Sequence, residues 1–189
     1  MTNVQDQQHS QRLWRGYLAK IKQEYQALDL LEQHWIIDRI GRIAELQKQL
    51  NNLFVAAGGL SACRQCSGAC CDCGKNHFTL ANMLTFVCAG LEPPEPDFSQ
   101  PCPFLGALGC RLEVFRRPFN CITFICEQVL EPLGKEGEEK FLRLEKELRS
   151  HYLAFDRRYA GSSLCGLFIR AERLAGRPFL SLIRKVISR

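Results

Sequence analysis

Closely spaced cysteines are the residues of this sequence whose type and spacing indicate chemistry. The chain has 189 residues, of which 11 are Cys, and most of them lie between residues 63 and 126. The first group opens with a Cys-x2-Cys pair, the spacing at which two thiolates of one tight turn reach the same metal ion without strain. Gly68 allows that turn to fold back, so that Cys70 or Cys71 can join the pair.

The second group, Cys102 to Cys126, supplies ligands from a part of the chain that is distant from the first group, Cys63 to Cys71. Metal bonds then offset the entropy of closing the loop between the two groups. The two groups together predict eight metal ligands: Cys63, Cys66, Cys70, Cys71, Cys102, Cys110, Cys121 and Cys126. Eight thiolates suffice for two four-thiolate sites or for one iron–sulfur cluster with ligands to spare, and spacing does not decide between them. Soft thiolates do exclude magnesium or calcium as the natural occupant.

The function that follows is chelation of zinc or iron, as the cofactor, by clustered Cys thiolates. One alternative is an iron–sulfur protein that is redox-active or acts with a modifying enzyme. A second alternative is a regulator that binds nucleic acid or protein and carries a structural metal. The sequence has no P-loop, G-x-G-x-x-G, H-E-x-x-H or G-x-S-x-G motif, and an all-thiolate set is typical of structure, storage or electron transfer. We therefore expect no catalytic residues and lean against an enzyme.

The redox compartment decides how the Cys are interpreted. Residues 1–11 lack the basic segment followed by an apolar one that marks a secretory signal, and no apolar run approaches the roughly 20 residues that span a bilayer. We therefore expect a cytoplasmic protein with no membrane partner. In reducing cytosol, closely spaced Cys are more often metal ligands or redox thiols than disulfides.

Not every Cys or His is expected to be a ligand. An isolated Cys is usually a small buried hydrophobic residue, and this is our interpretation of Cys88 and Cys165. The role of Cys73 stays open. His77 is the one His near the Cys groups, and we interpret it as a loop or surface residue.

The order of the Cys resembles a known family. The residues that carry the resemblance are Cys63-x2-Cys66-x-Gly68-x-Cys70-Cys71, then Cys102-Pro103-Phe104-Leu105, Cys110, Arg117-Pro118 and Cys121. This pattern is similar to that of the YkgJ-type bacterial cysteine-cluster family, whose members are described as zinc- or iron-chelating proteins. The resemblance covers about a third of the chain and implies that every Cys in the quoted pattern is a ligand. It does not extend to Cys126, and Ile122 stands where the family often has Arg.

Basic residues near the second Cys group have a physical interpretation of their own. Pro118 restricts Arg117 to extended conformations and so stiffens the approach to Cys121. A guanidinium near several thiolates offsets their negative charge and favours deprotonation. Arg111, Arg116 and Arg117 are the candidates for this role, and solvation at the surface is the alternative.

The net charge of +5 is concentrated at the end of the chain, because residues 138–189 hold 12 Lys or Arg against 6 Asp or Glu. Such a face can bind nucleic acid or an acidic partner, but it is more often a solvated helix face. Nucleic acid is therefore disfavoured as a partner, while a protein partner at the helical regions is left open. If nucleic acid does bind, neutralising Arg157, Arg158, Arg170 and Arg173 is expected to weaken it.

The fold class we predict is mainly α: a helical hairpin and C-terminal helices around a Cys-rich, loop-dominated metal-binding centre. Three regions divide the chain, an N-terminal helical region 1–57, a Cys-rich metal-binding region 58–133 and a C-terminal helical region 134–189, which together form one compact unit. The C-terminal helices are expected to pack back on the first pair.

Apolar spacing and capping residues predict individual elements of this fold. Asp29 and Glu32 have the spacing of a capping box that begins the second helix of the hairpin. Trp14, Tyr17 and Trp35 are expected in the core. The other predicted elements are a helix capped by Thr79 that runs to about Ala89, an extended loop over 91–103, and helices over 138–159, after 161–163 and over 179–187.

Overall fold

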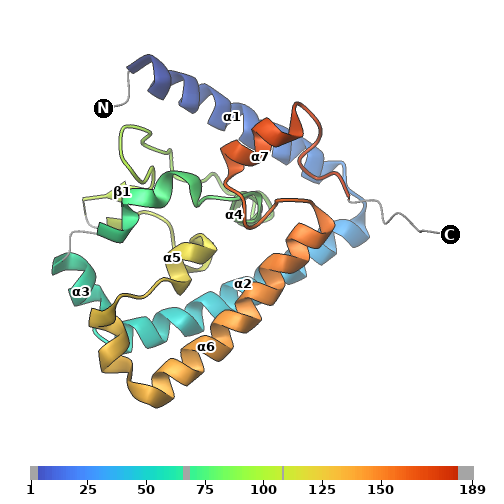
Figure 1. Cartoon of the computed structure of the whole chain (residues 1–189). Helices are drawn as coiled ribbons and strands as arrows, with labels where there is room; N and C mark the ends of the chain where they lie inside the picture. The colour runs from blue at the N-terminus through green and yellow to red at the C-terminus, as the bar shows by residue number, and fades with distance from the viewer. Residues whose placement is uncertain (1–3, 66–68, 108, 183–189) are drawn as a thin grey trace.

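The computed structural model describes residues 4–65, 69–107 and 109–182, without the side chains of residues 69, 70, 72 and 73. The fold is mainly helical, as predicted. Its first two helices are α1 (Val4–Gln26) and α2 (Leu30–Ala56). They run in opposite directions, but they diverge as the arms of a V, and the middle of the chain lies between them (Figure 1). The predicted hairpin is thus an open one.

The turn between α1 and α2 is capped as predicted, but only in part. The Asp29 carboxylate accepts a hydrogen bond from the backbone N–H of Glu32, at 2.8 Å, and so caps α2. The Glu32 side chain does not return the bond. It is buried and instead accepts hydrogen bonds from Arg158 and Tyr159. The reciprocal half of the predicted capping box is therefore replaced by a contact with the end of the last long helix.

The middle of the chain contains short helices. The first are α3 (Gly59–Gln65), the 3-10 helix η1 (Ala69–Asn76) and α4 (Leu80–Val87). Thr79 caps α4 as predicted, and Asn82 completes a capping box with it. Every residue of α4 is buried, which makes this helix the centre of the molecule. An extended segment follows over 91–97, also as predicted, and its Glu95 binds Arg15 of α1 at 2.7 Å.

A small β-hairpin and two short helical turns complete the middle region. Strands β1 (Leu105–Gly106) and β2 (Gly109–Cys110) pair antiparallel, with Leu105 opposite Cys110. They are followed by the 3-10 helix η2 (Val114–Arg116) and by α5 (Phe119–Thr123). The hairpin and α5 lie between the arms of the V, beside α3 and η1 (Figure 1).

The C-terminal part packs back on the first two helices, as predicted. Helix α6 (Glu127–Arg158) lies along α2 and bends at Gly134, where φ is 62° (Figure 1). Helix α7 (Leu167–Leu174) lies against α1, where the rings of Phe168 and Tyr17 are 5.5 Å apart. The helix predicted over 179–187 is wrong for residues 179–182, of which 179–180 form a turn and 181–182 have no regular structure, and the rest of it lies outside the described residues.

One apolar core joins these elements. Trp14 packs on Phe78 and Phe104, with ring centres 5.1 and 5.7 Å away, and Phe155 packs on Trp35 at 5.2 Å. The prediction of Trp14, Tyr17 and Trp35 as core aromatics is confirmed, Tyr17 and Trp35 being partly buried.

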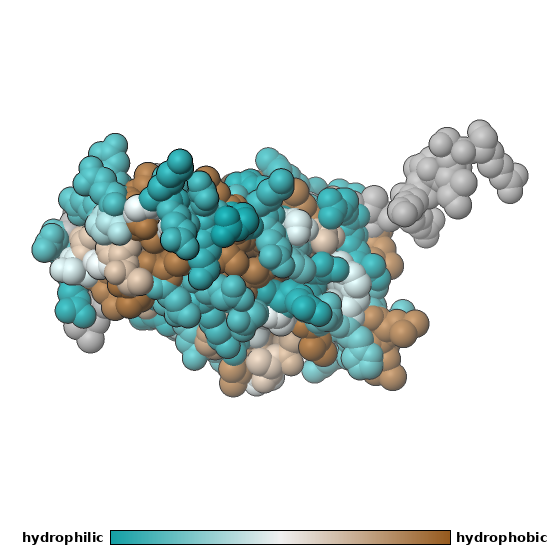
Figure 2. Space-filling model, turned by 90° about the horizontal axis from the view of Figure 1, so that it is seen from below, coloured by the Kyte–Doolittle hydropathy of each residue, from teal (hydrophilic) through white to brown (hydrophobic). Residues whose placement is uncertain are grey.

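The surface is mainly hydrophilic on the face shown in Figure 2, with apolar areas among the charged residues. Leu30 and Leu31, at the start of α2, are 70% and 82% exposed. Among the described residues, none of the helices combines the length and the apolar character that a membrane crossing requires.

Candidate metal centre

The predicted ligands come from several short elements of the middle region. Cys71 lies in η1, Cys102 in the turn before β1, Cys110 in β2 and Cys121 in α5. Cys63, in α3, and Cys126, which precedes α6, are exposed at the surface. The remaining two cannot be placed as ligands, because Cys66 and the side chain of Cys70 lie outside the described residues, as does the side chain of Cys73.

Backbone N–H groups of Phe104 and Leu105 and the charge of Arg111 all favour the thiolate form of Cys102. Burial outweighs them and leaves the pKa of Cys102 raised. Backbone N–H donors around a half-buried sulfur supply the hydrogen bonds that a metal-bound thiolate accepts.

The charges of three other cysteines act on the thiol of Cys121. Although the residue is exposed at the surface, partial loss of solvent around its sulfur is the largest cause that raises its pKa, followed by the negative charges of Cys110, Cys102 and Cys71. Arg117 opposes this shift. Like charges close together disfavour ionisation of each thiol, and a bound cation relieves that repulsion. The structure thus brings one thiol of the first group and three of the second into one neighbourhood.

His77 also belongs to this neighbourhood, and the sequence interpretation missed it. Its Nδ1 lies 3.6 Å from Sγ of Cys121. The side chain is half-buried, and burial lowers its pKa, so that the neutral imidazole is favoured. A neutral imidazole is the form that binds metal. The one signal in the sequence is that His77 follows Cys73 with three residues between them.

The three Arg near the second Cys group differ in what they contact. Arg111 donates to the carbonyl of Pro103 at 2.6 Å, and its charge lowers the pKa of Cys102. Arg117 donates to the carbonyl of Leu112 at 3.1 Å, and its charge opposes the rise in the pKa of Cys121. These two charges act on the thiols as expected.

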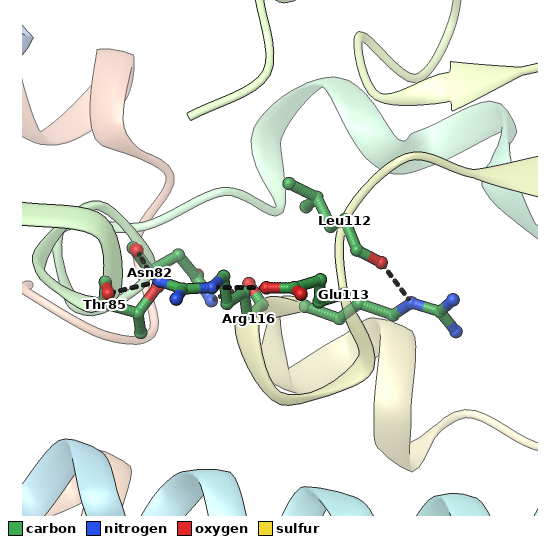
Figure 3. Close-up of polar contacts among 6 residues, drawn as sticks. Asn82, Thr85, Leu112, Glu113 and Arg116 are labelled. Atoms are coloured by element: carbon green, nitrogen blue, oxygen red, sulfur yellow. Dashed lines mark hydrogen bonds and ion pairs between the residues drawn. The ribbon is translucent and has the colours of Figure 1, made fainter. Parts of the chain in front are cut away.

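Arg116 has a structural role instead. It is buried, donates to the carbonyl of Thr85 and binds the Glu113 carboxylate at 2.8 Å (Figure 3). Its guanidinium also lies 4.6 Å from the ring centre of Phe86, and its own carbonyl accepts a hydrogen bond from Asn82 at 3.2 Å. These contacts join η2 to α4. Arg116 thereby fixes the position of the segment that continues to Arg117 and Cys121.

Of the two Cys that were interpreted as hydrophobic residues, Cys88 packs on the core, whereas Cys165 precedes Gly166, which packs on the backbone of Asn76 beside His77. Cys88 is half-buried against the core, and burial raises its pKa to about 11. Cys165 is half-buried near α7, where its sulfur accepts a hydrogen bond from Arg173 at 3.7 Å.

Two of the four Arg proposed for nucleic-acid binding, Arg158 and Arg170, are engaged within the fold. Arg158 pairs with Glu32 and lies over the ring of Trp35, at 4.4 Å. Arg170 is 3% exposed and donates to the carbonyl of Phe179. Neutralising these residues would therefore disturb packing, and a resulting loss of nucleic-acid binding would not identify a basic interface.

The donor set fits a soft or borderline metal, because thiolates and imidazole are the preferred ligands of zinc and of iron–sulfur clusters. The arrangement is not complete, however. Among the side chains that the structure describes, which leave out those of Cys66, Cys70, Asp72 and Cys73, no group of three or more His, Cys, Asp or Glu is placed so that it could hold a metal ion. The described thiols are neighbours and do not yet converge on one point.

Comparison with known proteins adds no relative. No protein-family model, no curated protein and no solved structure matches the chain. The resemblance to the YkgJ-type family therefore depends on the Cys spacing alone and stays a prediction.

Proposed function

We propose that this protein binds zinc or iron through Cys thiolates of its middle region, at a centre built around Cys71, Cys102, Cys110 and Cys121. The observation that carries the proposal is that the charges of Cys110 in β2, Cys102 in the turn before β1 and Cys71 in η1 act on the thiol of Cys121 in α5. Three of the four thiols are half-buried and Cys121 is exposed, and backbone N–H groups of Phe104 and Leu105 favour the thiolate form of Cys102. Cys63, Cys66, Cys70 and Cys126 are the further ligands of the proposal.

Metal binding completes the centre in this proposal. Sites with several thiolates from distant parts of a chain are rarely formed without metal, and the free energy of binding then contributes to folding. The residues that hold the metal would be Cys, and the metal would neutralise their charge and join η1, the β-hairpin and α5.

An iron–sulfur cluster is the second candidate, because the same thiolates suit it equally. The two candidates differ in their visible spectrum. A zinc centre is colourless, whereas an iron–sulfur cluster gives a brown protein whose absorbance is lost in air. A protein purified without oxygen separates them.

Single Cys variants test which thiols share a site. Cys66→Ser and Cys121→Ser are compared by metal content per chain, with Cys88→Ala as the control, because Cys88 packs on the core. Loss of all metal in both variants indicates one shared centre, and loss of half in each indicates two. Full metal content in both variants would contradict the proposal, as would a wild-type protein that is reduced, folded and free of metal.

A further inference from the structure

We propose that Nδ1 of His77 is a ligand of the metal ion, paired with Sγ of Cys121 in a mixed imidazole–thiolate site. This inference rests on the metal binding proposed above. It adds a nitrogen donor to a ligand set that the Cys spacing gives as thiolates only. The juxtaposition that supports it is the separation of 3.6 Å between the two atoms.

A tetrahedral zinc ion determines how far apart two of its ligands lie. With a Zn–S bond of about 2.3 Å, a Zn–N bond of about 2.0–2.1 Å and the tetrahedral angle between them, the sulfur and nitrogen atoms are about 3.6 Å apart. The distance from Sγ of Cys121 to Nδ1 of His77 has this value. One zinc ion can therefore bind both atoms where they are. A thiol–imidazole hydrogen bond spans a similar distance, so the test has to distinguish the two.

The segment that carries His77 is held from two sides. The backbone N–H of His77 donates to the carbonyl of Gly74 at 3.1 Å, and Gly74 packs directly on Cys102. On the other side, Gly166 approaches the backbone of Asn76 so closely that a Cβ atom at position 166 would clash with its carbonyl oxygen. Backbone contacts on two sides therefore hold the segment that carries His77 in place.

Cys121 is also held in place, by contacts of α5. Its backbone N–H donates to the carbonyl of Pro118 at 3.0 Å. Two residues earlier, Phe119 is buried against Tyr152, with ring centres 5.2 Å apart. Cys121 itself is exposed, so a metal ion from solution can reach the pair. The pair therefore joins two elements that are far apart in the sequence, η1 with its following turn and α5.

Candidates for the remaining metal ligands, and for a hydrogen-bond partner of the other ring nitrogen of His77, lie nearby. Cys71, Cys102 and Cys110 are the thiols whose charges act on Cys121, so they are the candidates to complete the site. His77 also lines a cavity of about 40 Å³, and the polar residues that line it with His77 are Asn76, Thr79, Asn120 and Ser163. This volume holds a water molecule, and a metal-bound imidazole usually donates its other N–H to water, a carbonyl or a carboxylate.

Cobalt(II) substitution tests the assignment, because the visible bands of tetrahedral cobalt(II) depend on the number of nitrogen and sulfur ligands. His77→Gln is expected to weaken cobalt and zinc binding by at least about tenfold, as loss even of a supporting residue does, and to change the cobalt bands. His34→Gln, an exposed residue of α2, is the matched control and should match the wild type. His77→Cys should restore tight binding with an all-thiolate spectrum. A His77→Gln protein with wild-type affinity and bands would overturn the assignment.

A measurement on the wild type covers the case in which His77→Gln does not fold. In the protein loaded with NMR-active cadmium, the ring protons of His77 should couple to the cadmium nucleus. A loaded protein without that coupling would overturn the assignment and leave the metal-binding proposal standing. A wild-type protein that binds neither cobalt nor cadmium would overturn both.

Discussion

Gly74 lies directly against Cys102: a Cβ atom at position 74 would lie 2.6 Å from Cβ and 2.7 Å from Sγ of Cys102. Atoms that are not bonded do not approach so closely, so the contact requires the absence of a side chain at position 74. It joins η1, which carries Cys71, to the turn that carries Cys102. The close approach of these two ligand-bearing segments is therefore sensitive to a single methyl group.

Gly74→Ala tests this contact. The added methyl group must push η1 and Cys102 apart, and overpacking of this kind lowers the free energy of unfolding by about 1–3 kcal/mol. Metal affinity should fall as well, which titration with zinc measures. Gly41→Ala is the control, because a Cβ atom there meets nothing within 4 Å and α2 should gain up to about 1 kcal/mol. If Gly74→Ala keeps both stability and affinity, the contact is not required.

Cys102→Ser and Cys88→Ala should differ in metal content. Cys102 is a proposed ligand whose thiolate form is favoured by nearby backbone N–H groups, so its loss should remove metal from the centre. Cys88 is half-buried against the core and away from the other thiols, so Cys88→Ala should keep the full metal content. Metal analysis of the two purified variants gives the comparison. Equal metal content in both would argue against Cys102 as a ligand.

Glu32→Gln should destabilise the fold near neutral pH. Hydrogen bonds from Arg158 hold the pKa of the buried Glu32 carboxyl below its usual value. A lowered folded-state pKa stabilises the fold above the unfolded pKa of about 4.3 and loses that effect as pH falls through the folded pKa. The loss from Glu32→Gln should be about 1–3 kcal/mol at pH 7 and shrink below about pH 4.

Urea unfolding of the wild type and of Glu32→Gln at several pH values measures this difference. Glu145→Gln removes an exposed ion pair with Arg149 within α6 and serves as the control, with a change below about 0.5 kcal/mol. A destabilisation by Glu32→Gln that is the same at pH 7 and at pH 3 would show that the charge of Glu32 does not contribute.

Arg116→Lys should weaken the junction of η2 and α4. The guanidinium bonds Thr85 and Glu113 in different directions and lies over the ring of Phe86, which an ammonium group cannot reproduce (Figure 3). We expect a loss of about 1–3 kcal/mol in the free energy of unfolding. Arg42→Lys, at an exposed position of α2, should change it by less than about 0.5 kcal/mol in the same thermal or urea unfolding experiment. Equal effects would contradict the structural role of Arg116.

Local features of the fold were predictable from the sequence. Thr79 caps α4 through its hydroxyl, which accepts a hydrogen bond from the backbone N–H of Asn82, three residues later. A contact of this kind spans only a few residues, so the sequence alone can predict it. The same holds for Asp29 at the start of α2. The side-chain direction of Glu32 was not predictable, because its partners Arg158 and Tyr159 are distant in the sequence. The open angle between α1 and α2 likewise depends on the elements that pack between them.

The candidate site was predictable in part, for the same reason. Cys spacing selected Cys71, Cys102, Cys110 and Cys121, which the structure brings into one neighbourhood. Spacing did not select His77, because its contact with Cys121 depends on how η1 and α5 are placed relative to each other. It also did not separate Arg116, which supports the frame, from its neighbours in the sequence that act on the thiols.

The most direct test of the account is the metal content and visible spectrum of the wild-type protein purified under reducing conditions without oxygen. We expect zinc or iron in a stoichiometric amount, which a chelator removes together with the ordered structure of the middle region. A brown protein that bleaches in air would identify the metal as iron–sulfur. A reduced, folded protein that contains no metal and takes up none would contradict the account.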